Sequence, residues 1–399
     1  LEMGKRIEDM AGEEVYDAKG MLVTPGFVDI HVHLREPGHE HKETIRTGTR
    51  AAAKGGYTTI VAMPNTDPVP DDAGKIQAFY EKVKRESLIR VKAYSAVTLG
   101  EKGEALVDFR DMLKAGALGF SDDGKGVQEA GMMYRAMKET AGLGSIITAH
   151  CEDESMLFGG YIHDGEYAQM HQHKGIHSLS EYLQVLRDIA ISEATGCRYH
   201  ICHMSTFGAV RALGRAQKDG IRASGEVTPH HLLLNEEDLR EEGRFKMNPP
   251  LRSRKDQEAL IEGLRDGVIA CIATDHAPHT KEEKGKGLEE SAFGIVGLET
   301  AFPLLYTHLV RKGHLTLKTL VDAMTKGPSK IMALSAGTME PGASADLTFM
   351  DLEKEWVIRS ADFQSMGRST PFENWTVKGQ VESVMFEGKF VVEGGKIIE

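Results

Sequence analysis

The chain has 399 residues, of which 41% are hydrophobic, and its formal net charge is −12. This length allows two or three domains, although an α/β barrel can fill it as a single unit. The acidic balance argues against a nucleic-acid partner, and no apolar run approaches the roughly 18 to 20 residues of a membrane helix.

Short apolar runs alternate along the chain with longer amphipathic ones. The apolar runs are rich in Val, Ile, Ala or Thr with few polar interruptions, which is typical of strands covered on both faces. We predict eight such strands, at residues 27–34, 57–64, 91–97, 117–121, 145–150, 198–203, 221–227 and 268–274. Between them, the spacing of apolar residues predicts helices, among others at 71–87, 179–195 and 254–265.

Eight strand–helix units are the number found in a (β/α)8 TIM-type barrel, and we predict this α/β fold. An open doubly wound sheet is the competing architecture, because it has the same alternation. The barrel is favoured because it brings the carboxyl ends of all its strands around one mouth. The polar residues that stand at or just beyond the ends of predicted strands are His150, His203, Asp275, Asp122 and Asp123.

The end of the chain has a different pattern. Short strands with glycine turns are predicted at 346–350, 381–386 and 389–392. Together with residues 15–23 they predict a small β subdomain built from both ends of the chain. We therefore expect three parts: residues 1–24 and 331–399 as the two halves of the small subdomain, and residues 25–330 as the barrel.

The cysteines and the first residues bear on cellular location. The four cysteines, Cys151, Cys197, Cys202 and Cys271, form no CxxC pair. We interpret them as buried, reduced thiols of a cytoplasmic protein. The opening residues, LEMGKRIEDM, are charged and do not resemble a secretory signal.

His31 and His33 occupy alternate positions of the first predicted strand. Residues i and i+2 of a strand point to the same face, about 6.5 Å apart, so both rings can reach one metal ion at roughly 2.0–2.1 Å. A chance pair, or a histidine satisfied in the core, is the alternative. His150, His203 and Asp275 favour the metal hypothesis, because they supply further ligands at later strand ends. Imidazole and carboxylate ligands indicate zinc.

Two metal ions close together need an anionic bridge between them. Asp122 and Asp123, at the end of the fourth predicted strand, are the candidates. Either carboxylate could instead cap a helix that begins near Val127. We favour Asp123 as the metal ligand, with Asp122 as the alternative.

Two polar segments are given no role. His163, His171, His173 and His177 lie in one polar loop, and we expect them to be exposed to solvent. Residues 281–290, rich in Lys and Glu, are interpreted as a solvated loop.

Eight short motifs follow one another along the chain. They are HVHLREPG (31–38), MPNT (63–66), DDG (122–124), AHCED (149–153), CHMST (202–206), EVTPHH (226–231), MNPPLR (247–252) and ATDHAPH (273–279). In this order they resemble the dihydroorotases of the longer bacterial type, within the amidohydrolase superfamily. Each motif alone is weak, but the ordered set is highly specific.

The resemblance implies a reversible interconversion of N-carbamoyl-L-aspartate and L-dihydroorotate in pyrimidine biosynthesis, with one or two zinc ions per subunit and two favoured. The metal ligands that it implies are His31 and His33 for the more buried ion, His150 and His203 for the more exposed ion, and also Asp123 and Asp275. Asp123 stands where many relatives have a bridging carboxylated lysine. Zinc lowers the pKa of its bound water to about 7. Asp275 would shuttle the proton of the resulting hydroxide to the departing nitrogen.

The same resemblance implies which residues bind the substrate. These are Arg35, Asn65 and His279 at its carboxylate, and Asn248 with the backbone of Phe293 and Gly294 near its ring. The planar guanidinium of Arg35 can match both carboxylate oxygens, which a lysine would not. The alternative for Arg35 is a structural ion pair with Glu36 or Glu40. One departure from the family is the loop SAFG (291–294), which replaces an expected proline-containing version.

Two other functions stay open. Another cyclic amidohydrolase, such as a hydantoinase or allantoinase, would share the HxH barrel, but these usually have the bridging lysine and lack the arginine of HLREP. A non-catalytic dihydroorotase-like subunit that scaffolds aspartate transcarbamoylase should have lost metal ligands, which this chain keeps. From family habit we expect a homodimer, with association to aspartate transcarbamoylase left open. We also expect a small β subdomain that lacks its first N-terminal strands.

Overall fold

Eight parallel strand segments close into a barrel in the computed structural model, which describes residues 16–398. Two parallel sheets supply most of it: β2 (Phe27–Val32), β3 (Tyr57–Ala62) and β4 (Arg90–Ala93) in one, and β5 (Ile146–Ala149), β8 (Arg198–Ile201), β9 (Ala223–Val227) and β10 (Cys271–Ile272) in the other. Single parallel bridges join the sheets, because Phe120 pairs with Ser95 and Ile147, and Val32 pairs with His276. The predicted (β/α)8 barrel is confirmed, although its fourth strand is reduced to the bridge at Phe120.

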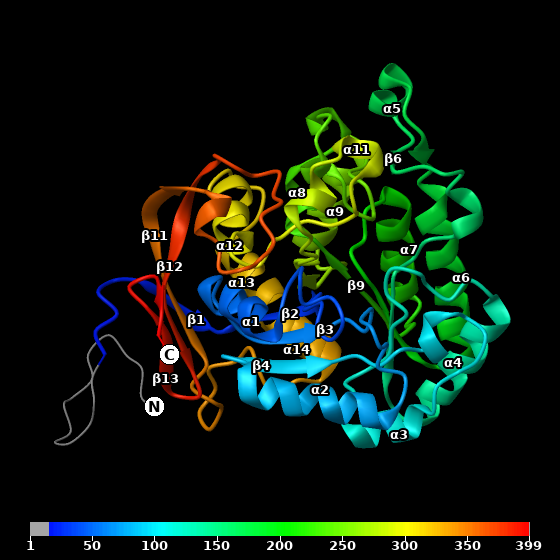
Figure 1. Ribbon diagram of the computed structural model, residues 1–399, viewed down its shortest axis with the longest axis horizontal. Coiled ribbons are helices and arrows are strands. Elements are labelled where there is room, and N and C mark those ends of the chain that lie inside the picture. Colours follow the sequence, from blue (N-terminus) through cyan, green and yellow to red (C-terminus); the bar gives the residue numbers. More distant parts are fainter. Residues whose placement is uncertain (1–15, 399) are drawn as a thin grey trace.

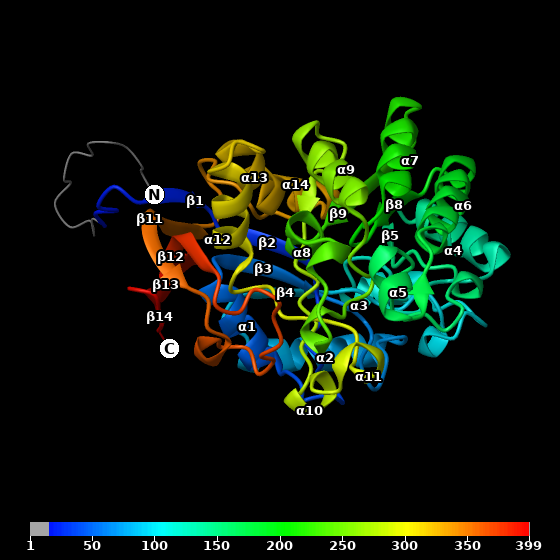
Figure 2. The same ribbon diagram turned by 90° about the horizontal axis from the view of Figure 1, so that it is seen from above.

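Helices follow the strands and form the outer layer of the barrel (Figure 1, Figure 2). The main helices are α1 (Ile45–Lys54), α2 (Ala73–Glu86), α3 (Phe109–Ala115), α4 (Ala130–Gly142), α6 (Leu179–Thr195), α7 (Phe207–Lys218), α9 (Arg254–Arg265), α13 (Leu317–Met324) and α14 (Lys326–Met332). Several of these helices are preceded by a residue whose side chain accepts a hydrogen bond from a backbone N–H of the first turn. Thr44, Asp72 and Ser253 are such N-cap residues, of α1, α2 and α9. Helices α6 and α9 have the predicted bounds, whereas α4 begins three residues after Val127.

The long connections at the barrel mouth contain short elements. These are β6 (Ile162–His163), α5 (Glu166–His171), β7 (Gly175–Ile176), α8 (Pro229–Leu233), α10 (Lys281–Lys284) and α11 (Gly287–Glu290). Helix α12 (Ala301–Leu305) instead packs on β12 of the small sheet, and its Phe302 stacks on Phe27 at the start of β2. The interpretation of 281–290 as a solvated loop is wrong in two respects. The segment forms the helices α10 and α11, and Lys284 and Leu288 are buried.

A separate antiparallel sheet lies beside the barrel, at the left of Figure 1. Its strand order is β1 (Leu22–Pro25), β11 (Leu347–Val357), β12 (Thr376–Phe386), β13 (Lys389–Glu393) and β14 (Lys396–Ile397). One strand therefore precedes the barrel and four follow it, which confirms a small β subdomain made from both ends of the chain. Asp346 joins this subdomain to the barrel. The backbone carbonyl of Asp346 accepts a hydrogen bond from the backbone N–H of Gly26, and the carboxylate of Asp346 forms an ion pair with Arg90. Residues 1–15, which hold the charged opening segment, lie outside the described part.

The main core fills the space between the barrel strands and their helices. Phe27, Tyr57, Phe120 and Tyr199 are all fully buried in it. The four cysteines are buried and free, as predicted. Among residues 16–398, no helix combines the length and apolarity needed to cross a bilayer. The polar residues of the predicted site, by contrast with this apolar core, lie at the barrel mouth, where the strands end.

Candidate active site

His31 and His33 stand at the end of β2, and hydrogen bonds from their Nδ1 atoms fix both rings. His31 is fully buried, and its Nδ1 donates to Glu226 Oε1 over 2.7 Å. The Nδ1 atom of His33 lies 2.8 Å from Asn65 Oδ1. Such partners make Nδ1 the protonated nitrogen and leave Nε2 as the metal-binding atom. The two Nε2 atoms face the same polar centre, as the strand period predicts.

Asp275 completes a first group of ligand atoms with this pair. Its Oδ1 lies 3.0 Å from His33 Nε2 and 3.5 Å from His31 Nε2. Asp275 follows β10 and has a left-handed backbone with φ of 48°. A non-glycine residue in this conformation is strained, and such strain is concentrated at functional sites. The two distances show that the buried carboxylate of Asp275 lies close to both imidazoles.

His150 and His203 form a second pair at the ends of β5 and β8. His150 Nδ1 lies 3.0 Å from His203 Nε2, and both rings are buried. Two nitrogens that bind one ion at roughly 2.0–2.1 Å are held about 3 Å apart when their bonds to it are near perpendicular. This separation is therefore compatible with a metal ion that both rings share.

Asp123 lies between the two pairs of histidines. Its Oδ1 is 3.4 Å from His31 Nε2 and 3.6 Å from His203 Nε2, and its Oδ2 is 3.5 Å from His33 Nε2. Asp122 points elsewhere: its carboxylate accepts from the backbone N–H groups of Val97 and Thr98 and from the Thr98 hydroxyl. Only Asp123 of the two carboxylates is thus near the histidines.

Opposite charges balance one another in this buried centre. Burial opposes ionisation of Asp123, but the charge of His31 and the nearby ring of His203 outweigh it and hold the pKa of Asp123 well below its usual range. Burial likewise opposes ionisation of Glu226, yet His31 and His200 lower the pKa of Glu226 to about 2. The pKa of Asp275 is also lowered, because His31 and His33 overcome the effect of burial. The three carboxylates are therefore ionised at neutral pH.

This set of donors fits divalent metal ions. The buried atoms His31 Nε2 and Asp123 Oδ1 have no hydrogen-bond partner, so their polarity calls for another ligand. Three sets of donor atoms lie close enough to hold an ion: His31, His33 and Asp275; Asp123, His150 and His203; and His31, Asp123 and Cys202. The first two together contain all six predicted ligands. Imidazole with carboxylate is a donor set typical of zinc.

A buried cationic side chain, Arg35, lies beside the metal-ligand cluster. Arg35, two residues after His33, donates from Nε to Pro278 O, and its Nη2 lies 3.3 Å from His279 Nε2. His279 Nε2 also lies 2.8 Å from Phe293 O. Burial, with the charge of Arg35, lowers the pKa of His279 to about 3, so its ring is neutral. The structure thus brings Arg35, His279 and Phe293 together.

The acidic neighbours of Arg35 in the sequence bind other groups. Glu36 accepts from the backbone N–H of Ile45 and from Lys82 Nζ, both at 2.9 Å. Glu40 accepts from the backbone N–H of Gly38. The guanidinium is therefore positioned by the backbone of Pro278 and by His279 rather than by the ion pairs considered from the sequence.

Asn65 and Asn248 lie against the metal-ligand histidines. Asn65 accepts from His33 through Oδ1, which leaves its amide NH2 available as a donor. Asn248 Nδ2 lies 3.0 Å from Glu152 Oε2 and 3.3 Å from His150 Nε2, and its buried Oδ1 has no partner. Both amides therefore present unused hydrogen-bonding atoms beside the cluster.

Lys284 ties together the two segments that carry Asn248 and Phe293. Its buried Nζ donates to Lys246 O over 2.9 Å and to Ala292 O over 2.6 Å. Lys246 O also accepts from the backbone N–H of Gly294. Burial and the nearby Lys246 lower the pKa of Lys284 to about 7. The side chain of Lys284 and the backbone bond from Gly294 to Lys246 thus hold the loop at Phe293 and Gly294 against the segment that leads to Asn248.

Three residues with evident roles in this geometry are absent from the predicted site. Glu226 orients His31, Glu152 contacts Asn248, and Lys284 holds the mouth loop. Glu226 and Glu152 stand inside the motifs EVTPHH and AHCED, so a search for carboxylates at strand ends would have found them. Lys284 had no such signal, because its neighbours in the sequence are charged and exposed.

The prediction that four loop histidines are solvent-exposed is wrong for His173, which is half-buried and hydrogen-bonded to Tyr161 and Glu241. It is also wrong for His163. Its side chain is buried in β6, and its Nδ1 lies 3.4 Å from Arg252 Nη1. The reason is that the loop contains the strand pair β6–β7, which seats this residue against the barrel. His171 and His177 are exposed, as predicted.

Known proteins share both the sequence and the fold. A family model described as "Dihydro-orotase-like" matches residues 20–208. The chain is 50% identical to the dihydroorotase of Shouchella clausii, over 99% of this chain and 93% of that protein. It is 53% identical to the dihydroorotase of Geobacillus thermodenitrificans, over 96% and 90% of the two chains. The L-hydantoinase of Arthrobacter aurescens has the same fold, with a TM-score of 0.90 and 27% identity over 99% and 90% of the chains. Fold, site geometry and sequence agree that this chain belongs to the dihydroorotase family, among the metal-dependent cyclic amidohydrolases.

Proposed function

We propose that this chain is a dihydroorotase, which cyclises N-carbamoyl-L-aspartate to L-dihydroorotate and water, and catalyses the reverse reaction, in pyrimidine biosynthesis. The observation that carries the proposal is the pairing of two sites in one barrel mouth. A cluster of metal-ligand atoms adjoins the buried pair of Arg35 and His279, which contact each other at 3.3 Å. A cyclic amide that carries a carboxylate needs both the metal-ligand cluster and a cationic partner such as Arg35. An uncharged ring needs only the metal-ligand cluster.

We assign the metal ligands as His31, His33, Asp123, His150, His203 and Asp275, and the ion as zinc, with two ions per subunit favoured. The position of Asp123 supports a bridging role, because it lies within 3.6 Å of nitrogens from both histidine pairs. A bound divalent ion supplies Lewis-acid activation of water and of the ring carbonyl.

Asp275 is the proposed proton shuttle. In the hydrolytic direction its carboxylate accepts a proton from the attacking water and delivers it to the ring nitrogen as the C–N bond breaks. In the cyclisation direction it takes the proton of the attacking nitrogen and delivers it to the oxygen that leaves as water. The position of Asp275 supports this role, because its Oδ1 lies 3.0 Å from His33 Nε2 and 3.5 Å from His31 Nε2, beside the proposed metal ligands.

The proposed carboxylate pocket consists of Arg35, Asn65 and His279. Arg35 offers the planar pair of donors that matches a carboxylate, and Asn65 offers the NH2 group that its bond to His33 leaves free. We place Asn248 and the backbone of Phe293 and Gly294 beside the ring of the substrate. The bonds of Lys284 to both segments support this placement, because they keep the two segments at a fixed separation.

The organisation of the whole chain is part of the proposal. We divide it into residues 1–24, 25–330 and 331–399, with the barrel in the middle part. We place the protein in the cytoplasm as a homodimer, and aspartate transcarbamoylase is the protein partner to be tested.

The test compares turnover of L-dihydroorotate with turnover of hydantoin and allantoin by the zinc-loaded protein. We expect turnover of L-dihydroorotate alone to be efficient, and to be abolished by chelation and restored by zinc. Turnover of only the uncharged rings would contradict the proposal and indicate a hydantoinase or allantoinase. A folded, zinc-loaded protein with no turnover would support the scaffolding alternative, which co-purification with aspartate transcarbamoylase would then test.

A further inference from the structure

The Nδ1 edge of the His279 ring contacts two charged side chains that belong neither to the metal-ligand cluster nor to the proposed carboxylate pocket. His279 Nδ1 lies 3.3 Å from Glu283 Oε2, on α10, and 3.5 Å from Lys42 Nζ, in the turn before α1. Lys42 and Glu283 also form an ion pair, with 2.8 Å between Nζ and Oε1. An ammonium group and a carboxylate therefore act on the same ring nitrogen.

The Nε2 edge of the ring shows which nitrogen carries the proton. His279 Nε2 lies 2.8 Å from the carbonyl oxygen of Phe293, which can only accept a hydrogen bond. Arg35 Nη2, which can only donate, is farther away, at 3.3 Å. The shorter contact requires a proton on Nε2. Because burial and the charge of Arg35 lower the pKa of His279 to about 3, the ring is neutral and carries this one proton. Nδ1 is therefore unprotonated.

An unprotonated Nδ1 beside a carboxylate is unfavourable, because two acceptors then face each other. Burial raises the pKa of Glu283, but the ammonium group of Lys42 and the backbone N–H of Thr280 outweigh it and lower this pKa to about 2. Glu283 is thus ionised. Lys42 makes the arrangement stable, because its positive charge compensates Glu283 and lies beside the lone pair of Nδ1. With Lys42 in place, the ring can keep its proton on Nε2.

The three side chains are shielded from solvent, which strengthens the electrostatic interactions between them. The side chains of His279, Lys42 and Glu283 are 9%, 16% and 30% exposed. Lys42 comes from the connection between β2 and α1, and Glu283 comes from the connection that follows β10. The position of Lys42 beside His279 therefore depends on the packing of two distant segments at the barrel mouth.

We propose that Lys42 is a positioning residue that holds His279 in the tautomer needed to bind the substrate carboxylate, an inference that rests on the proposed function. A carboxylate accepts hydrogen bonds and donates none, so His279 can bind it only through a protonated Nε2. Without Lys42, the uncompensated carboxylate of Glu283 draws the single proton to Nδ1, because a hydrogen bond to a charged acceptor is stronger than one to a carbonyl. The unprotonated Nε2 then repels the substrate carboxylate.

Steady-state kinetics of the zinc-loaded protein separates this role from that of a merely structural ion pair. Lys42→Met should raise KM for L-dihydroorotate by about 10-fold or more, with a smaller change in kcat, because a hydrogen bond to a charged group is lost. E283Q should change KM little, because Lys42 and the capping bond from Thr280 remain. The double variant K42M/E283Q should recover most of the loss, since no carboxylate then competes for the proton. Equal losses in both single variants, with no recovery in the double variant, would overturn the proposal.

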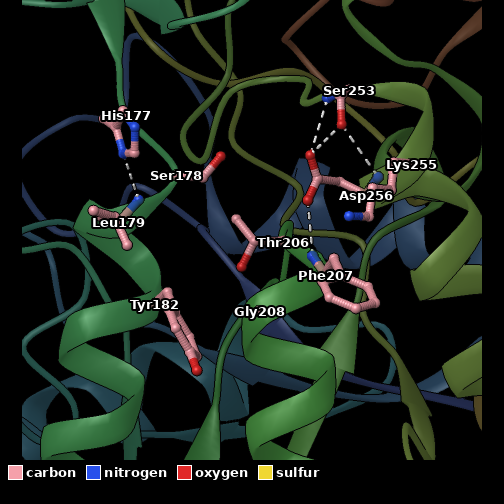
Figure 3. Close-up of a pocket in the computed structure, with 10 residues that line it drawn as sticks. All are labelled: His177, Ser178, Leu179, Tyr182, Thr206, Phe207, Gly208, Ser253, Lys255 and Asp256. Carbon is pink, nitrogen blue, oxygen red and sulfur yellow. Dashed lines mark hydrogen bonds between the residues drawn. The ribbon is translucent and has the colours of Figure 1, made fainter.

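Lys255→Met is the matched control, because the loss of any lysine weakens the general attraction of the protein for an anionic substrate. Lys255 is exposed on α9, and its Nζ lies 4.7 Å from the ring centre of Phe207, at a hollow between α6, α7 and α9 (Figure 3). None of the proposed substrate-binding residues lines this hollow. We expect K255M to keep the KM of the wild type. An equal rise of KM in K255M and K42M would show an effect of net charge alone and would overturn the proposal.

NMR spectroscopy of the protein with ¹⁵N-labelled histidine observes the tautomer itself, independently of turnover. Protonated and unprotonated imidazole nitrogens give separate signals, and those of His279 are identified among the 17 histidines by their absence from H279Q. We expect a proton on Nε2 in the wild type and in K42M/E283Q, and on Nδ1 in K42M. A wild type with its proton on Nδ1, or a K42M variant in which Nε2 stays protonated, would contradict the role of Lys42. If the proton moved to Nδ1 in K42M but the wild type did not turn over L-dihydroorotate, control of the tautomer by Lys42 would stand and the proposed function would fail.

Discussion

Replacement of Glu226 by Gln should weaken metal binding although Glu226 is not an assigned ligand. The carboxylate is fully buried and takes three hydrogen bonds, from His31 Nδ1 at 2.7 Å, from His200 Nε2 at 3.0 Å and from the backbone N–H of His203 at 3.2 Å. Glutamine keeps the shape of the side chain but exchanges one acceptor oxygen for an NH2 donor. One of the two imidazole donors must then lose its partner or change its tautomer.

The expected loss of metal affinity depends on whether the substitution disturbs His31 Nε2, the proposed metal-binding atom. If His31 changes tautomer, its Nε2 carries the proton and cannot bind a metal ion. Loss of an outer carboxylate that orients a ligand histidine costs about 10–100-fold in metal affinity, which is about 1.4–2.8 kcal/mol. This agrees with the roughly 1.5–3 kcal/mol of a hydrogen bond to a charged group.

The assay is a competition for zinc between the apoprotein and a chelator of known affinity. Asp188→Asn is the matched control, because Asp188 is also a fully buried carboxylate that accepts hydrogen bonds, but it lies on α6 and bonds Tyr199 and Arg187. We expect zinc affinity to fall 10–100-fold in E226Q and to be unchanged in D188N. Equal zinc affinity in E226Q and the wild type would refute the reasoning that Glu226 fixes the tautomer of His31.

Two further predictions concern the substrate pocket and the mouth loop. Arg35→Lys should raise KM for L-dihydroorotate by about 10-fold or more with a smaller change in kcat, because a lysine cannot contact both oxygens of the substrate carboxylate as an arginine does. Steady-state kinetics measures both constants, and an unchanged KM would show that the substrate carboxylate binds elsewhere. In Lys284→Met, the pH dependence of stability should change. The pKa of Lys284 is about 7 in the folded protein against 10.5 for a free lysine, so the unfolded chain binds more protons between these pH values and wild-type stability gains with rising pH. Denaturant unfolding at pH 7 and pH 10 should show this gain in the wild type relative to K284M, and a constant difference between the two proteins would contradict the lowered pKa.

The barrel and the histidine pair could be predicted because their signals are local. Continuous apolar runs mark strands that are covered on both faces, and the two-residue period of a strand places His31 and His33 on one side. The small sheet was also predictable from glycine turns and short apolar runs. The fourth barrel strand was overestimated, because its run at 117–121 is apolar but pairs only at Phe120.

The rest depends on contacts between distant parts of the chain. The sequence favours Asp123 over Asp122 only weakly, and the geometric distinction comes from the backbone N–H groups of Val97 and Thr98, which bind Asp122. The burial of Lys284 depends on two carbonyl groups, at Lys246 and Ala292, that no local pattern reveals. Charged composition alone therefore gave a wrong prediction for residues 281–290.

The most direct test of the proposed function measures N-carbamoyl-L-aspartate formed from L-dihydroorotate by the zinc-loaded wild type and by Asp275→Asn. Asparagine keeps the size of the side chain but removes the base. The proposal predicts turnover by the wild type and a loss of about 10²–10⁴-fold in kcat in the variant, the usual contribution of a general acid–base group. Zinc content measured on both samples separates loss of the base from loss of metal. No product from a fully loaded wild type would contradict the proposed activity, and near-normal kcat in the loaded variant would place the proton shuttle on another residue.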